Sequence, residues 1–349
     1  MHAPTGPQPH ASPAPAGPSP TRIFDALNAF QQTEALRAAL ELDLFTPLAA
    51  GPLEPAALAR ACGADPRGVR ILADFLVLQG FLAKHGSAYG LTPDAAAFLV
   101  RSSPACMAGL VDFLLSPDLR GSFDRLAEAV RRGGTALAAE GTVSHENPVW
   151  VTFARAMAPM MRPTAGLLAG LLAPDPARPL RVLDVAAGHG LFGLALAAAH
   201  PQAHVTALDW PGVLQVAAEN ARAAGAHGRY ALKPGSAFEV DWGGPYDLVL
   251  LTNFLHHFDP ETCVGLARRA RAALAPGGRC ATLEFVPDEG RVSPPTAAAF
   301  ALTMLATTPR GDAYTFEEYR GIFARAGFAH SRLHALPPTP QHAIVSHTA

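Results

Sequence analysis

The chain has 349 residues, of which 49% are hydrophobic and 16% charged, and its formal net charge is -2 at pH 7. This length is too great for one average domain, and the composition suffices for buried cores. The near-neutral charge excludes a global positive field that would draw the protein onto nucleic acid or an anionic membrane. We therefore expect a small-molecule ligand, no nucleic-acid partner and no membrane association.

Residues 1–20 are mainly Pro, Ala, Ser and Gly and predict a flexible tail. They lack the basic and apolar regions of a signal peptide, and no apolar run elsewhere is long enough to span a bilayer. The four cysteines lie far apart without a CxxC pair, which indicates reduced thiols rather than disulfides or a zinc site. We expect a cytoplasmic protein.

Residues 21–103 are predicted to form a helical domain in the order of a winged helix. Apolar residues recur at three- and four-residue steps in IFDALNAFQQTEALRAALELDLF, and two short helices follow, PAALARAC and DPRGVRILADFLVLQGFL. AKHGSAYGLT then predicts a small hairpin. The last helix carries only Arg67 and Arg70 as cations on an otherwise apolar sequence, which favours a dimer or interdomain contact over a DNA groove.

Residues 104–172 predict a helical connector, interrupted by Gly133 and Gly134 and by the loop GTVSHENP. Over residues 173–349, strand-like runs alternate with alanine-rich helical stretches, which is typical of a doubly wound, Rossmann-like α/β sheet. These runs are LRVLDV, AHVTAL, RYAL, YDLVLL and RCATLEFV. The closing SRLHAL and HAIVSH predict an antiparallel hairpin at the edge of this mostly parallel sheet.

The stretch DVAAGHGLFG follows the first strand of that sheet and fits two kinds of ligand. Gly188, Gly190 and Gly193 have the G-x-G-x-x-G spacing of a dinucleotide turn, but Asp184 ends the strand before them. A carboxylate there would repel a pyrophosphate and attract the ammonium and sulfonium groups of S-adenosylmethionine. Asp209 ends the second strand, where it can accept the ribose hydroxyls of either ligand. The turn favours S-adenosylmethionine and leaves NAD open.

DVAAGHG and the acidic end of the second strand are followed by four further motifs, in the order and spacing of one enzyme family: GSAFE, LHHFDPETC, LAPGG and LEFVP. From about residue 20 onward the chain resembles the S-adenosylmethionine-dependent small-molecule O-methyltransferases of the caffeate and acetylserotonin type. The resemblance implies an N-terminal winged-helix dimerisation domain and hence a homodimer. It also implies methyl transfer to a hydroxyl oxygen of a small, aromatic, specialised metabolite.

The resemblance places the family's general base at His256. A neutral imidazole can take a hydroxyl proton as the oxygen attacks a methyl group. Glu284 ends the neighbouring strand and is expected to hold the far ring nitrogen of that histidine. His257 occupies the place of a family aspartate and is expected to face away. Ala313 stands where the family has a second glutamate, and the adjacent Asp312 is the candidate substitute.

The cofactor contacts that the resemblance implies follow successive strands of the sheet. They are Asp184, Gly188, Gly190, Asp209, Trp210, Ser236, Ala237, Phe238, Thr252 and Asn253.

In this set the two glycines bracket the methionine moiety, Asp209 holds the ribose, and Trp210 with Ala237 and Phe238 encloses the adenine. Ser236 replaces an aspartate, and its hydroxyl can accept the same hydrogen bond. Ala186 replaces the first glycine of the turn.

The segment WVTFARAMAPMM resembles the family's pocket-lining helix. It assigns acceptor contacts to Phe153 and Met157, which share one helical face, and Met304 carries the same expectation. An apolar pocket would assist methyl transfer, since the sulfonium charge is neutralised as the reaction proceeds.

Three other functions stay open. A C-methyltransferase, or other non-O-methyl chemistry on this scaffold, could use His256, His257 and a carboxylate to hold a metal, although adjacent histidines rarely converge on one ion and we expect no metal. An inactive S-adenosylmethionine-binding regulator could use the winged helix to contact a partner or DNA. An NAD-dependent oxidoreductase is supported only by the glycine spacing.

Overall fold

The structure, a computed structural model, describes residues 18–137, 140–172 and 178–348. The chain forms two compact units, residues 1–108 and 109–349. The first unit therefore ends at Ala108 rather than at residue 103, and most of the predicted connector belongs to the second unit. The predicted tail falls mainly on residues 1–17, which lie outside the described residues.

The first unit has the predicted order of helix, turn, helix and hairpin. Its elements are α1 (Thr21–Glu41), a 3-10 helix (Thr46–Ala50), α2 (Pro55–Cys62), α3 (Pro66–Leu78), β1 (Leu82–His85), β2 (Ala88–Leu91) and α4 (Pro93–Phe98). Asp65 caps α3, because its carboxylate accepts the backbone N–H groups of Arg67 and Gly68 at 2.9 and 3.1 Å. Pro66 at the first helical position strengthens this start.

The second unit opens with helices that pack onto its sheet domain. They are α5 (Leu110–Leu114), α6 (Pro117–Asp124), α7 (Leu126–Arg132) and α8 (Val149–Leu172). Between α7 and α8 the chain lies close to the loop after α12 (Pro295–Thr307): the backbone N–H of Thr135 donates to Thr308 at 2.8 Å. A Cβ on Gly134 would lie 2.1 Å from the carbonyl oxygen of Pro309, so only glycine fits this approach. The segment is thereby held against the loop that follows α12.

The sheet of the second unit has seven strands in the order β5-β4-β3-β6-β7-β9-β8. Their bounds are β3 (Leu180–Val185), β4 (Ala203–Asp209), β5 (Tyr230–Pro234), β6 (Tyr246–Thr252), β7 (Leu274–Glu284), β8 (His330–Ala335) and β9 (His342–His347). The first five are parallel, and β9 pairs antiparallel with both β7 and β8, so the doubly wound sheet and its edge hairpin are confirmed. The strand order reverses between β3 and β6, where such folds bind ligands beyond the carboxyl ends of the strands.

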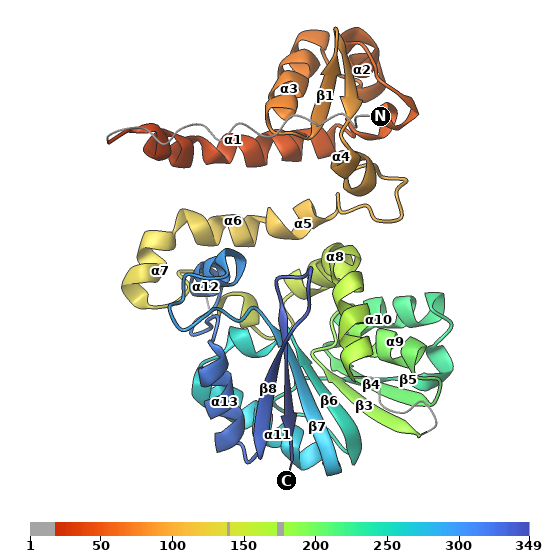
Figure 1. Ribbon diagram of the computed structural model, residues 1–349, viewed down its shortest axis with the longest axis vertical. Helices are drawn as coiled ribbons and strands as arrows, with labels where there is room; N and C mark the ends of the chain where they lie inside the picture. Colours follow the sequence, from red (N-terminus) through yellow and green to blue (C-terminus); the bar gives the residue numbers. More distant parts are fainter. Residues whose placement is uncertain (1–17, 138–139, 173–177, 349) are drawn as a thin grey trace, which may run out of the picture. The chain divides into compact units, whose positions relative to one another are not determined.

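Helices cover both faces of this sheet (Figure 1). They are α8, α9 (Leu191–Ala199) and α10 (Pro211–Ala223) on one face, and α11 (Pro260–Ala273) and α13 (Phe316–Arg325) on the other. Alternate strand residues feed the two cores: Val182 packs with the first set and Leu183 with the second. Near-continuous apolar runs are what a sheet buried on both faces requires.

Strand β7 begins earlier than predicted. The predicted strand covered RCATLEFV, whereas β7 starts at Leu274, which pairs with Tyr246 before the register shifts. The intervening glycines permit this close approach, since a Cβ on Gly278 would lie 2.9 Å from the carbonyl oxygen of Ala275 and 3.1 Å from that of Tyr246.

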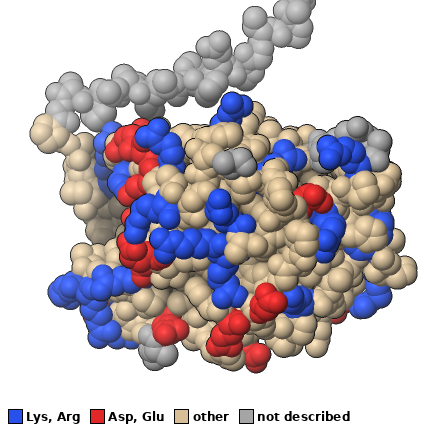
Figure 2. All heavy atoms as spheres, turned by 90° about the horizontal axis from the view of Figure 1, so that it is seen from below, with Lys and Arg blue, Asp and Glu red and all other residues tan. Residues whose placement is uncertain are grey.

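Charged side chains of both signs are interspersed on the face drawn in Figure 2. Among the described residues, several charged side chains are paired, for example Arg155 with Glu219 at 2.8 Å and Arg325 with Glu261 at 2.6 Å. Within the described ranges, no helix is long and apolar enough to cross a membrane. The four cysteines are free thiols, and Cys263 and Cys280 are buried.

Candidate active site

A cavity of about 570 Å³ lies beyond the carboxyl ends of β3, β4 and β6, within the second unit. Eight of the ten predicted cofactor residues line it: Gly188, Asp209, Trp210, Ser236, Ala237, Phe238, Thr252 and Asn253. These residues come from segments far apart in the sequence, and the parallel strands bring them to one edge. The cavity is therefore the candidate ligand site.

The other two predicted cofactor residues, Asp184 and Gly190, do not line the cavity: Gly190 is part of the glycine turn, and Asp184 lies in the strand before it. Asp184 has no exposed surface, and one of its carboxylate oxygens accepts the backbone N–H of Gly193 at 3.1 Å. Burial raises the pKa of Asp184 to about 8, so at neutral pH it is mostly uncharged. The electrostatic attraction that sequence analysis assigned to Asp184 is thus not supported, because the strand ends inside the core.

Asp209 instead presents its carboxylate to the cavity. One oxygen accepts the backbone N–H of Gly188 at 2.8 Å, and the other accepts that of Trp210 at 2.7 Å. Burial raises the pKa of Asp209 to about 6, so the group is still mostly ionised at neutral pH. Each oxygen has a further lone pair, so this fixed carboxylate can accept two vicinal hydroxyl groups.

The glycine turn adopts left-handed backbone conformations at three positions, with φ of +53° at Ala186, +57° at Gly188 and +75° at Gly190. Alanine at position 186 is strained there, because its Cβ crowds the backbone in this region. A Cβ on Gly190 would lie 2.4 Å from the hydroxyl of Tyr230, so this position requires glycine for space as well as for conformation.

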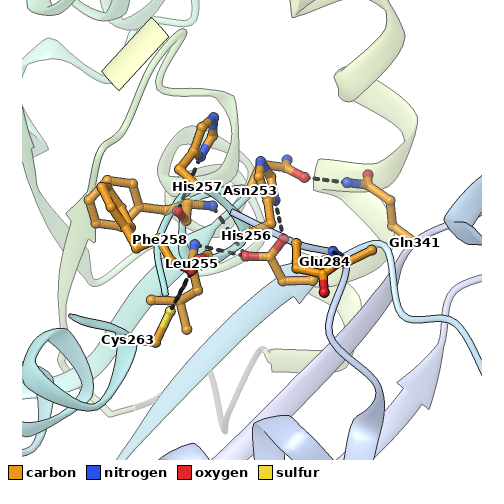
Figure 3. Close-up of polar contacts among 11 residues, drawn as sticks. Asn253, Leu255, His256, His257, Phe258, Cys263, Glu284 and Gln341 are labelled. Atoms are coloured by element: carbon orange, nitrogen blue, oxygen red, sulfur yellow. Dashed lines mark hydrogen bonds and ion pairs between the residues drawn. The ribbon is translucent and has the colours of Figure 1, made fainter. Parts of the chain in front are cut away.

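His256 and Glu284 are in direct contact, as Figure 3 shows. The Nδ1 atom of the imidazole faces one carboxylate oxygen of Glu284. The other oxygen accepts the backbone N–H groups of Phe254 and Leu255 at 3.2 and 3.0 Å. Adjacent parallel strands thus bring these two residues together, in the pairing that the sequence predicted.

Burial shifts the pKa values of His256 and Glu284 in opposite directions. It lowers the pKa of His256 to about 3 and raises the pKa of Glu284 to about 8, because each loses solvation of its charged form. The imidazole is therefore neutral near pH 7. The ring of Phe300 lies edge-on to it at 4.8 Å and limits access of water to the pair.

His257 was expected to face away, and this expectation is wrong: His257 lines the cavity. The two histidines lie in a 3-10 helix (Leu255–His257), where successive side chains point about 120° apart. His257 lines the cavity, and His256 lies behind that lining. The Nδ1 atom of His257 lies 3.2 Å from the carbonyl oxygen of Phe254, and Trp150 packs edge-on to its ring at 5.1 Å.

Asp312 does not bring its carboxylate to the imidazole. The carboxylate lies 3.4 Å from Arg291 and accepts the backbone N–H of Ala313 at 2.8 Å. Only the main chain of Asp312 meets the histidine, donating its N–H to the carbonyl oxygen of His256 at 2.9 Å. Adjacency in sequence did not determine the direction of this side chain, and no described carboxylate takes the place of the family's second glutamate beside His256.

Among the predicted acceptor contacts, Phe153 lines the cavity, whereas Met157 and Met304 are buried and do not. Met157 lies one helical turn beyond Phe153 and packs into the core against the sheet. Phe153 and Met157 do share one face of α8, but the cavity extends only as far as Phe153.

Several cavity residues were not identified from the sequence as site residues, among them His145, Trp150 and His189. The ring of His145 packs on that of Trp210 at 4.5 Å, and Trp150 donates from its indole N–H to Thr142 at 2.9 Å. Trp150 begins the segment that identified Phe153, so its spacing was a usable signal. His145 lies in a loop without periodicity and gave none.

The glycine turn, the acidic end of the next strand and the flat side chains beside it define a nucleoside-binding site on a doubly wound sheet. Comparison with known proteins specifies the class further. Residues 171–329 match the O-methyltransferase domain, and residues 24–101 match the O-methyltransferase dimerisation domain.

Relatives extend this match over nearly the whole chain. Acetylserotonin O-methyltransferase of Mus musculus molossinus is 32% identical over 341 residues, covering 93% of this chain and 87% of that protein. The tetracenomycin polyketide synthesis 8-O-methyl transferase of Streptomyces glaucescens is 30% identical and covers 91% of this chain and 94% of its own length. A solved structure from Nostoc punctiforme, described as an O-methyltransferase, is 50% identical with a TM-score of 0.92, covering 95% of this chain and all of that one.

The chain belongs to the O-methyltransferase family, and it is an S-adenosylmethionine-dependent enzyme. Family membership decides between the two ligands that the glycine spacing left open. The residues present fit the cofactor: Asp209 offers two acceptor oxygens to a ribose, and Trp210 and Phe238 offer flat surfaces to an adenine. Ser236 already accepts the backbone N–H of Phe238 at 3.2 Å and retains its hydroxyl proton for a ligand.

Gly190→Ala is predicted to lower the free energy of unfolding by about 2–4 kcal/mol, because it adds left-handed strain and an overlap with Tyr230. The matched control is Gly166→Ala on the exposed face of α8, where nothing lies within 4 Å and helix propensity should add about 0.5–1 kcal/mol. Denaturant unfolding measures both. Equal effects of the two substitutions would show that the turn tolerates a side chain.

Proposed function

We propose that the enzyme transfers the methyl group of S-adenosylmethionine to a hydroxyl oxygen of a small aromatic acceptor, with His256 as general base and Glu284 as its positioning residue. The observation that carries this proposal is the buried contact between the Nδ1 atom of His256 and the Glu284 carboxylate. Such a contact selects the tautomer whose Nε2 atom carries the lone pair.

With the lone pair on Nε2, His256 can accept the hydroxyl proton of the acceptor. When bound, the cofactor supplies an electrophilic methyl group on its sulfonium. As the acceptor oxygen attacks that methyl group, the Nε2 atom of His256 takes the hydroxyl proton. Glu284 holds the ring in orientation and stabilises the imidazolium that forms, since its second oxygen remains fixed by two backbone N–H groups.

Aromatic side chains support an aromatic acceptor. Trp150, Phe153, Phe254 and Phe258 line the cavity on the side of the histidines. Their rings pack edge-on, with Trp150 and Phe153 at 5.5 Å and Phe254 and Phe258 at 5.1 Å, and such surfaces accommodate another planar ring. The names of the relatives agree: they include acetylserotonin and 3-amino-4-hydroxybenzoate O-methyltransferases.

His256→Asn is predicted to lower kcat by about 10²–10⁴-fold, because asparagine can still donate to Glu284 but has no Nε2 atom. His257→Asn should cost less than about tenfold, since His257 is not bonded to the carboxylate. Initial rates with a phenolic acceptor provide the measurement, and titration calorimetry with S-adenosylmethionine verifies that both variants bind the cofactor. If His257→Asn loses the rate and His256→Asn retains it, His257 is the base.

The pH dependence follows from the same pair. The active form needs an ionised Glu284, because a protonated carboxyl donates to Nδ1 and leaves the proton on Nε2. Since burial raises the pKa of Glu284 to about 8, kcat/KM for the cofactor is predicted to rise with pH, with its midpoint near pH 8 and its plateau above that pH. Acceptors whose phenol pKa values differ should give the same midpoint. If the midpoint instead shifts with the pKa of the phenol, the rise of kcat/KM with pH reports ionisation of the acceptor.

The first unit supports a homodimer. Four large apolar side chains of α1, Ile23, Phe24, Leu27 and Phe30, are 59–67% exposed in this single chain, and three of them recur at helical spacing on one face. Exposed apolar patches of this kind mark protein interfaces. The match of residues 24–101 to a dimerisation domain assigns such a role to this segment.

Phe30→Glu is predicted to shift the protein toward monomer, because a carboxylate buried in an apolar interface loses its solvation. Val292→Glu, at an apolar residue that is 76% exposed in the second unit, is the control and should leave the assembly unchanged. Size-exclusion chromatography with light scattering gives the masses. A wild-type protein of monomeric mass would contradict the homodimer.

A further inference from the structure

His189 lies in the middle of the glycine turn and is the turn's ring-bearing residue. It lines the cavity while only 2% of its surface is exposed. Its backbone is held by α10, since the side-chain amide of Asn220 donates to the His189 carbonyl oxygen at 2.8 Å. The imidazole therefore has a defined place within the wall of the site.

The hydrogen bond at Nδ1 determines which ring nitrogen carries the proton. The Nδ1 atom of His189 accepts the backbone N–H of Leu191 at 3.1 Å, so Nδ1 bears the lone pair. Burial and the nearby Arg162 lower the pKa of His189 to about 4, which keeps the ring neutral. The proton then resides on Nε2, and among the described residues this N–H group has no acceptor.

The surroundings favour an anionic acceptor for that N–H group. Leu191 opens helix α9, whose first backbone N–H groups bear partial positive charge, and Gly190 precedes it as the N-cap. A donor placed beside a helix start adds to the same preference. Asp209, at the end of the neighbouring strand, accepts the backbone N–H of Gly188, which directly precedes His189 in the turn.

We propose that the Nε2–H group of His189 donates a hydrogen bond to the carboxylate of the methionine moiety of S-adenosylmethionine. That carboxylate is the one anionic group of the cofactor, whose ammonium and sulfonium are positive. With the ribose at Asp209, the methionine moiety extends along the glycine turn toward His189. The inference depends on the cofactor alone and is independent of which histidine removes the acceptor proton.

The test compares two ligands that differ only in this carboxylate, S-adenosylmethionine and its decarboxylated form, by titration calorimetry of the full chain. Wild-type protein should bind the decarboxylated ligand about 10–100-fold more weakly, as expected for loss of a buried hydrogen bond to a charged group. Equal affinity for the two ligands would overturn the proposal.

Two substitutions separate the donor from the turn. In His189→Asn the side-chain oxygen can replace Nδ1 as acceptor for Leu191, so the turn is kept and the donor is lost. In His189→Gln the amide nitrogen can replace Nε2, so a donor is retained. His189→Asn should weaken S-adenosylmethionine binding by about 10–100-fold and leave the affinity for the decarboxylated ligand unchanged. His189→Gln should restore most of the wild-type preference for S-adenosylmethionine over the decarboxylated ligand.

The matched control is His145→Ala, which removes a ring from the opposite part of the cavity, beside Trp210. It should weaken the binding of both ligands by the same factor, because His145 is not the proposed donor to the carboxylate, the only group in which the two ligands differ. If His189→Asn also weakens both ligands equally, His189 acts only through the shape of the turn and the proposal fails. Failure here would leave the assignment of His256 as base unaffected.

Discussion

A carboxylate without exposed surface, Glu284, organises the catalytic end of the sheet. Burying such a group is costly unless donors surround it, and here Phe254, Leu255 and the His256 ring supply them. All three donors belong to one short segment after β6. The same interaction therefore determines where the segment lies and how the imidazole is oriented. A substitution of Glu284 would change both the backbone after β6 and the position of the His256 ring.

The glycine turn is held in a comparable way from two sides. Asp184 accepts the N–H of Gly193 from beneath, and Asp209 accepts the N–H of Gly188 at the cavity. These carboxylates end adjacent strands, yet one is enclosed by the core and the other faces the ligand. Both contacts are made within the chain itself, and together they fix the shape of the turn.

The strands of the second unit could be predicted because apolar runs end in polar residues at regular intervals. The pairing of His256 with Glu284 also followed, since parallel neighbours align their carboxyl ends. The orientation of His257 did not follow, because it depends on the 3-10 geometry of one short turn. His145 could not be found at all, since only tertiary packing brings that loop onto Trp210.

The antiparallel hairpin at the sheet edge reaches the cavity through one side chain. Gln341, only 2% exposed and directly before β9, donates from its amide to the side-chain oxygen of Asn253, which lines the cavity with a φ of +52°. Successive side chains on a strand alternate between faces, so one residue inserted between Gln341 and β9 would turn the amide to the wrong side. An insertion or deletion between Gln341 and β9 would therefore break this hydrogen bond, whereas one in the turn that precedes Gln341 would leave it in place.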